Sequence, residues 1–293
     1  MVLLTALAGN SQWLDGGAMF GNAPRALWEN WAQVDQKHRI KLSCRSLLIE
    51  DQDVKILCEV GIGAFFPPHL AERYGVQPLH HMLLESLHQN GLNDSDISYI
   101  ILSHLHFDHA GGLLPDYQSR LKSGERLLFP KAKYVVSRRA WERAIKPHPR
   151  DQASFIPELI DMLKMSNRLI ILDDEEKIPG LERFSFFETQ GHTPGHLHTL
   201  YRGDNRSVVF AGDLIPGVPW IHLPITMGYD RYAELVIDEK ENFYKRSLKE
   251  QWLVFFTHDP KYAMASLIKD EKGKYKTNAE EIWEEKDLVK FQL

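Results

Sequence analysis

A short run that places several metal-binding side chains directly after an apolar segment is the feature that most constrains the fold of this chain. The run "ILSHLHFDHAGG" spans residues 101–112 and holds three histidines and one aspartate within six positions. Alternate side chains of an extended segment point the same way, so His104 and His106 can reach one metal ion. The chain must then turn, and Asp108 and His109 cannot aim at the same point without crowding. These two residues therefore indicate a second ion beside the first.

A divalent ion with four or five ligands needs more side chains than this one loop supplies. Three later runs, "FFETQGH", "VVFAGD" and "WLVFFTHD", each follow an apolar strand pattern and place a ligand at its end: His192, Asp213 and His258. A purely structural role would bury several unpaired polar groups, at about 1–3 kcal/mol each. Imidazole and carboxylate ligands together suit Zn, Mn, Fe or Co. We therefore predict that two divalent metal ions bind where these strands end, and Zn is the favoured metal.

Apolar runs and helical patterns alternate along the rest of the chain. Residues 38–50 and 54–63, separated by the polar turn "DQD", predict a β-hairpin of two strands. Near the C-terminus a second hairpin is expected to turn at Gly273. A charged helix or tail is expected to follow it over residues 278–293.

Composition limits the classes of function. Hydrophobic residues make up 43% and charged residues 26% of the 293 residues, as in a globular α/β protein, and we expect one domain over 1–293. The net charge of -5 offers no basic surface for nucleic acid. No apolar stretch approaches the ~20 residues that span a bilayer, and no charged segment precedes the N-terminal apolar run. We therefore predict a cytoplasmic protein with no membrane partner. Cys44 and Cys58 are too few for a disulfide framework.

The order and spacing of these side chains resemble the metallo-β-lactamase-fold hydrolase superfamily over nearly the whole chain. The resemblance implies a four-layer αββα sandwich with two metal ions at one edge, between the sheets. The ligands that it implies for the first ion are His104, His106 and His192. For the second ion they are Asp108, His109 and His258, and Asp213 bridges the two ions.

Four stretches are most similar to the branch that contains the acyl-homoserine lactonases and methyl parathion hydrolases: "LDGGAMFG", "HLHFDHAGG", "GHTPGH" and "HDP". The function implied is the opening of a lactone or ester by a hydroxide shared between the two ions. N-acyl homoserine lactone is the specific substrate predicted. Asp108, as the proton carrier, and Asp213 are the expected catalytic residues. The resemblance also allows a homodimer.

Glu59 departs from the family pattern, which commonly has an aspartate after this strand. The longer side chain could support the ligands from behind, where such partners change affinity or activity about 10- to 100-fold, or it could displace a ligand. Other residues could line the substrate pocket or hold the metal ligands in place from behind, but each could equally be a packing residue. Together with Glu59, these candidates are His196, Met19, Phe20, Trp220 and Tyr229.

Other functions remain open at this point. A phosphotriesterase, a β-lactamase or a thioesterase would use the same two-metal mechanism. A di-iron redox protein or a metal-binding protein that lost catalysis through the Glu59 change would belong to another class. A panel of substrates on metal-loaded protein, with metal analysis, separates these alternatives.

Overall fold

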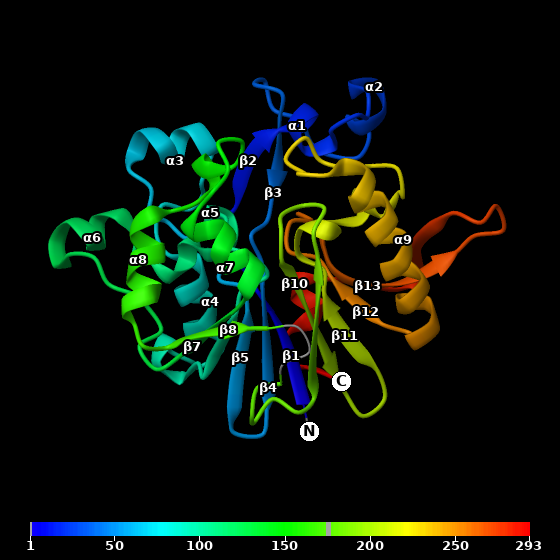
Figure 1. Ribbon diagram of the computed structural model, residues 1–293. Helices are drawn as coiled ribbons and strands as arrows, with labels where there is room; N and C mark the ends of the chain where they lie inside the picture. The colour runs from blue at the N-terminus through cyan, green and yellow to red at the C-terminus, as the bar shows by residue number, and fades with distance from the viewer. Residues whose placement is uncertain (1, 174–176) are drawn as a thin grey trace.

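Two large sheets lie face to face, with helices on the outer side of each, in a computed structural model that describes residues 2–173 and 177–293 (Figure 1). The layer order is therefore helix, sheet, sheet, helix. It confirms the α/β fold class predicted from the sequence.

The first sheet contains both ends of the chain, and its strand order is β15-β1-β4-β5-β6-β7-β8. Its strands are β1 (Val2–Leu7), β4 (Ser46–Asp51), β5 (Val54–Cys58), β6 (Tyr99–Ile101), β7 (Lys133–Ser137), β8 (Leu169–Leu172) and β15 (Phe291–Gln292). The helices on its side of the molecule are α3 (Pro68–Tyr74), α4 (Met82–Gln89), α5 (Phe107–Ala110), α6 (Tyr117–Ser123), α7 (Arg138–Ile145) and α8 (Pro157–Met165).

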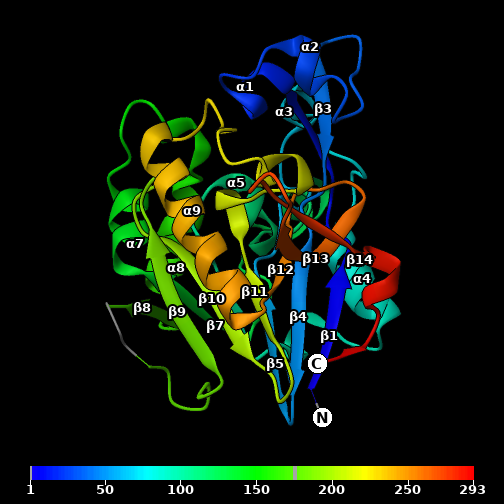
Figure 2. The ribbon, with the colours of Figure 1, turned by 90° about the vertical axis from the view of Figure 1, so that its right-hand side faces the viewer.

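The second sheet has the strand order β14-β13-β12-β11-β10-β9, and one long helix packs on its outer face (Figure 2). Its strands are β9 (Phe184–Thr189), β10 (His196–Arg202), β11 (Ser207–Phe210), β12 (Leu253–Phe255), β13 (Tyr262–Lys269) and β14 (Tyr275–Glu284). The long helix is α9 (Ala233–Glu250).

A small hairpin-like sheet stands above the two large sheets in Figure 1. It pairs β2 (Gln12–Asp15) with β3 (Arg39–Leu42), and α1 (Gly16–Phe20) and α2 (Arg25–Trp28) lie between them in the sequence. Short 3₁₀ helices complete the described elements: Asp94–Asp96, Gly111–Leu113, Gln152–Ser154, Gly212–Leu214, Val218–Ile221 and Glu285–Leu288.

Alternation along the strands explains why the sheets are covered on both faces. In β7, Tyr134 and Val136 face the helices, whereas Val135 points to the layer between the sheets. In β11, Val208 faces that same inner layer and Val209 packs under α9. Because successive side chains serve different cores, the central residues of β7 and β11 are apolar on both faces.

Two predicted elements are wrong in part. Residues 38–50 were predicted as one strand, but they divide into β3 and β4, which lie in different sheets. Between them, the N–H groups of Ser43 and Arg45 donate to the carbonyls of His258 and Thr257, so the chain leaves one sheet for the other. Residues 278–293 form neither one charged helix nor a loose tail, and their only helical part is the 3₁₀ turn Glu285–Leu288. The chain turns at Gly273 as expected, but pairing with β13 extends β14 to Glu284.

None of the helices within the described residues is both long and apolar enough to span a membrane. Cys44 and Cys58 are buried and unpaired, as the sequence predicts.

Candidate metal centre

The predicted ligands converge at one end of the two sheets, and they come from the ends of four strands. His104 and His106 follow β6 in an extended stretch, and α5 begins directly afterwards. Asp108 and His109 lie in that single helical turn, which gives them a different direction from the two preceding histidines. This is the turn that the sequence required.

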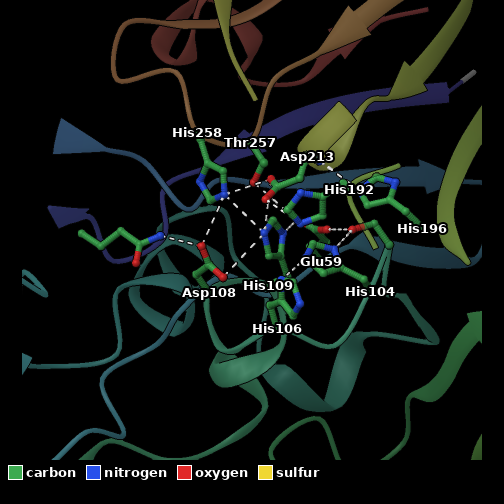
Figure 3. A network of polar contacts seen from close by, with 12 residues as sticks. Glu59, His104, His106, Asp108, His109, His192, His196, Asp213, Thr257 and His258 are labelled. Carbon is green, nitrogen blue, oxygen red and sulfur yellow. Dashed lines mark hydrogen bonds and ion pairs between the residues drawn. The ribbon is translucent and has the colours of Figure 1, made fainter. Parts of the chain in front are cut away.

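Two groups of three side chains are each close enough to hold one ion. The ligand atoms of His104, His106 and His192 all lie within 4.8 Å of one another. Those of Asp108, His109 and His258 do the same. All are drawn in Figure 3.

Asp213 lies between the two groups (Figure 3). Its Oδ2 is 3.4 Å from Nε2 of His192, in the first group. Its Oδ1 is 3.3 Å from Nε2 of His109 and 3.2 Å from Nε2 of His258, both in the second. The structure thus brings together all seven side chains that the sequence singled out.

The inner atoms of the cluster indicate that the residues fit metal ions. Nε2 of His192 and Oδ1 of Asp213 are buried and have no hydrogen-bond partner within the described part of the chain, although Oδ1 lies close to the imidazoles of His109 and His258. Buried polar atoms are rarely left unsatisfied, because each costs about 1–3 kcal/mol. Lone pairs of imidazole and carboxylate that point at a shared space are the donor set of a divalent ion such as Zn²⁺.

Glu59 lies behind the cluster. Its Oε2 is 2.8 Å from Nδ1 of His109, and its Oε1 accepts a hydrogen bond from Ser103. Ser103 Oγ is in turn 2.9 Å from Nδ1 of His104. The ligand atoms of a third group, Glu59 with His104 and His109, also lie within 4.8 Å of one another. However, Oε2 of Glu59 faces the outer nitrogen of His109, and Oε1 reaches the outer nitrogen of His104 only through Ser103, which places this carboxylate in support of the predicted ligands.

His196 also supports the cluster from outside. Its Nε2 accepts a hydrogen bond from the backbone N–H of Asp213 at 3.0 Å, and its Nδ1 lies 3.3 Å from Nε2 of His198. Burial, followed by the neighbouring imidazole of His198, lowers the pKa of His196 well below its usual value. The ring is therefore neutral and can accept this bond, which holds Asp213 in place.

Three supporting contacts were not found from the sequence. Asp230 Oδ1 is 2.9 Å from Nδ1 of His192, Gln12 Nε2 donates to Oδ2 of Asp108 at 2.6 Å, and Nδ1 of His258 is 2.6 Å from the carbonyl of Ser43. The partners are 38, 96 and 215 positions apart, and no motif surrounds them.

The two ends of the cluster differ electrostatically. Burial, with the neighbouring imidazoles, lowers the pKa of His104 and of His106 well below the usual value. Burial also opposes the charged form of His109, but Glu59, Asp213 and Asp108 outweigh it and raise its pKa well above the usual value. Since metal binding requires neutral imidazoles, an ion would compete with a proton more at His109 than at His104.

A cavity of about 470 Å³ opens onto the cluster. The predicted ligands at its base are His106, Asp108, His192, Asp213 and His258. Its walls are mainly apolar, with a polar strip formed by Arg150, Asp151 and Ser154; the apolar lining is Leu14, Met19, Tyr74, Phe107, Ala153, Met227 and Tyr229.

The candidate pocket residues divide into two sets. Met19 and Tyr229 line the cavity, and burial raises the pKa of Tyr229 to about 12, which keeps its hydroxyl protonated. Phe20 and Trp220 lie behind the wall instead, stacked at 4.7 Å between ring centroids in a buried cluster.

Comparison with known proteins identifies what the chain is similar to. The family model described as the metallo-beta-lactamase superfamily matches residues 39–115 and 127–258. An N-acyl homoserine lactonase from Bacillus sp is 29% identical over 185 residues, which cover 60% of this chain and 62% of that protein. The chain thus spans less than two thirds of the length of the curated relatives it matches.

Among solved structures, a probable metal-dependent hydrolase from Staphylococcus aureus superposes with a TM-score of 0.82 at 25% identity, covering 95% of this chain and 97% of the other. AidC, a dizinc quorum-quenching lactonase with a bound product, superposes with a TM-score of 0.73 at 24% identity, covering 94% of each chain. These neighbours share the arrangement of layers described above.

Proposed function

Since this chain belongs to the metallo-beta-lactamase superfamily, we propose that it is a dinuclear metal-dependent hydrolase that opens a lactone or ester. The specific substrate proposed is an N-acyl homoserine lactone. The observation that carries the proposal is the position of Asp213, between two three-residue groups and at the base of a largely apolar cavity.

We assign one ion to His104, His106 and His192, and the other to Asp108, His109 and His258, with Asp213 shared. Two divalent ions held there would lower the pKa of a shared water towards about 7 and polarise the substrate carbonyl. In this assignment Glu59 and Asp230 accept the outer N–H groups of His109 and His192, so each ring turns its other nitrogen inwards.

Asp108 is the proposed proton carrier. Its side chain is 13% exposed on the cavity side, and its carboxylate faces His109 and His258 at 3.7 and 3.6 Å. Gln12 occupies one acceptor position of Oδ2, and a carboxylate oxygen has a second position that can take a proton. Asp108 can therefore receive a proton at Oδ2 while it stays oriented.

The cavity walls suit an acyl chain. Leu14, Met19 and Met227 offer apolar surface beside the cluster, and Phe107 begins the helical turn that carries Asp108. Such walls bind an alkyl group and exclude bulk water from the reacting bond. The N-acyl homoserine lactonases among the relatives support this choice of substrate.

The test is a substrate panel on zinc-loaded protein: an N-hexanoyl homoserine lactone, a methyl phosphotriester, a β-lactam and a thioester. The expected result is the highest kcat/KM on the lactone. Asp108→Ala and Asp213→Ala should abolish turnover and leave the circular dichroism spectrum unchanged. Asp161→Ala, at an exposed position of α8, is the control and should retain the full rate.

A preference for the phosphotriester would replace the proposed substrate but keep the two-metal mechanism. A wild-type rate in either aspartate variant would contradict the mechanism itself. No turnover of any substrate at two ions per chain would overturn the proposed function.

A further inference from the structure

Gln12 lies directly behind Asp108 and is completely buried. Its Nε2 donates to Oδ2 of Asp108 over 2.6 Å, although the two residues are 96 positions apart. A hydrogen bond from a neutral donor to a carboxylate is shorter and stronger than one between neutral groups. The contact therefore holds the carboxylate in one orientation.

The need for such a donor follows from the chemistry of the second group of ligands. Nδ1 of His109 faces the Glu59 carboxylate at 2.8 Å, and Nδ1 of His258 faces the Ser43 carbonyl at 2.6 Å. An imidazole N–H needs an acceptor behind it, so that the other nitrogen presents its lone pair to a metal ion. A carboxylate ligand carries only acceptors, and its outer partner must be a donor.

We propose that Gln12 is the positioning residue for Asp108 at the second ion. The Gln12 amide supplies the donor that the carboxylate requires. It fixes the rotation of the carboxylate, so that Oδ1 lies 3.7 Å from Nε2 of His109 and Oδ2 lies 3.6 Å from Nε2 of His258. The inference rests on the two-ion site proposed above, and it concerns binding of the second ion before any substrate is present.

The backbone around Gln12 is fixed firmly enough for this role. Asn10 Nδ2 donates to the carbonyls of Pro78 and His80 at 2.7 and 2.8 Å. Ser11 and Gln77 exchange two backbone hydrogen bonds of 2.6 and 2.9 Å. These contacts anchor the start of β2 to the segment that precedes α4.

The same face of β2 serves the cavity. Because side chains alternate along a strand, Gln12 and Leu14 point to the same side. Leu14 lines the cavity, and Gln12 reaches the aspartate at the cavity's base. Gln12 therefore links the small sheet of β2 and β3 to the second ion.

The experiment is a calorimetric titration of metal-free protein with Zn²⁺. Gln12→Met keeps nearly the same length without a donor, and Gln12→Asn keeps the amide but draws it back by one methylene. Asp108→Ala serves as the reference that identifies which binding step belongs to the second ion. Ser86→Ala is the matched control, because it removes the 2.8 Å hydrogen bond that the buried Ser86 hydroxyl donates to the Ala8 carbonyl, away from every predicted ligand.

In both Gln12 variants we expect the affinity for the second ion to fall by about 10- to 100-fold, and the first step to stay unchanged. The ligand-field spectrum of the Co²⁺-loaded protein should change only in the component that Asp108→Ala also removes. Ser86→Ala should lower the unfolding temperature and leave both binding steps intact.

Unchanged affinity for the second ion would overturn the inference, and so would equal weakening of both steps, which would mean that Gln12 is only a packing residue. Neither result depends on turnover. If the lactonase proposal fails because no substrate reacts, the Zn²⁺ titration and the Co²⁺ spectrum still decide the role of Gln12.

Discussion

Oδ1 of Asp230 lies 2.9 Å from Nδ1 of His192, and both side chains are buried. The other carboxylate oxygen of Asp230 accepts a hydrogen bond from the backbone N–H of Met227 at 2.7 Å. One residue therefore supports a predicted metal ligand and shapes the loop that forms part of the cavity wall.

Asp230→Ala should weaken binding at the first ion by about 10- to 100-fold, because His192 loses the acceptor that orients its ring. Chelator competition on zinc-loaded protein measures this change. Asp230→Asn retains a carbonyl oxygen that can accept from His192, so its loss of affinity for the first ion should be smaller. Equal affinity in wild-type protein and Asp230→Ala would show that the contact does not orient the ligand.

Glu59→Ala should lower kcat/KM by about 10- to 100-fold, since it removes the partner of His109 and also that of Ser103. Glu59→Gln keeps one acceptor oxygen, so only part of the loss is expected. Steady-state kinetics at saturating Zn²⁺ make the comparison. Full activity in Glu59→Ala would mean that the glutamate has no part in holding the ligands.

Metal removal should destabilise the protein, because it leaves Nε2 of His192 and Oδ1 of Asp213 buried without hydrogen-bond partners. Free Zn²⁺ at 1,000 times its dissociation constant should stabilise the fold by about 4 kcal/mol per ion. Thermal unfolding with Zn²⁺ or with chelator measures the difference. In His258→Ala, the unfolding temperature should differ less between Zn²⁺ and chelator. An identical unfolding temperature of the wild-type protein in both conditions would count against a metal centre.

Stability should also depend on pH through Lys240, which is fully buried and donates to the carbonyls of His222, Leu223 and Ile225. Burial lowers the pKa of Lys240 from 10.5 to about 7. Between these values the unfolded chain binds more protons than the folded one, so the free energy of unfolding rises with pH. The slope has an upper limit of about 1.4 kcal/mol per pH unit.

Urea unfolding of metal-free wild-type protein and Lys240→Met between pH 7 and 10 tests this dependence. The variant is expected to be less stable throughout, because it leaves three carbonyls without a donor. Wild-type stability should rise with pH relative to the variant. A constant difference between the two proteins across this range would refute the assignment.

The sequence predicts which side chains come together at the candidate site, because they follow apolar strands whose ends meet at one edge of the fold. His192, Asp213 and His258 each lie shortly after the end of such a strand, which is the position that singled them out. The layers follow for a similar reason: strands that are apolar on both faces must be covered on both sides.

The supporting residues could not be found in the same way. Gln12, Asp230 and Ser43 have no local pattern, and each acquires its role from the tertiary pairing of distant segments. The break between β3 and β4 has the same origin, since Ser43 and Arg45 bind the backbone of the segment after β12. Long-range partners of this kind are not encoded in the periodicity of one sequence.

The short loop that contains Met227, Gly228, Tyr229 and Asp230 limits how this protein can evolve. Its first three residues line the cavity, and the fourth holds His192. An insertion or deletion here would change the cavity wall and displace a predicted metal ligand in a single mutational event. Leu14 and Ala153 line the same cavity from other segments, so new specificities can arise there by substitution with the ligands left in place.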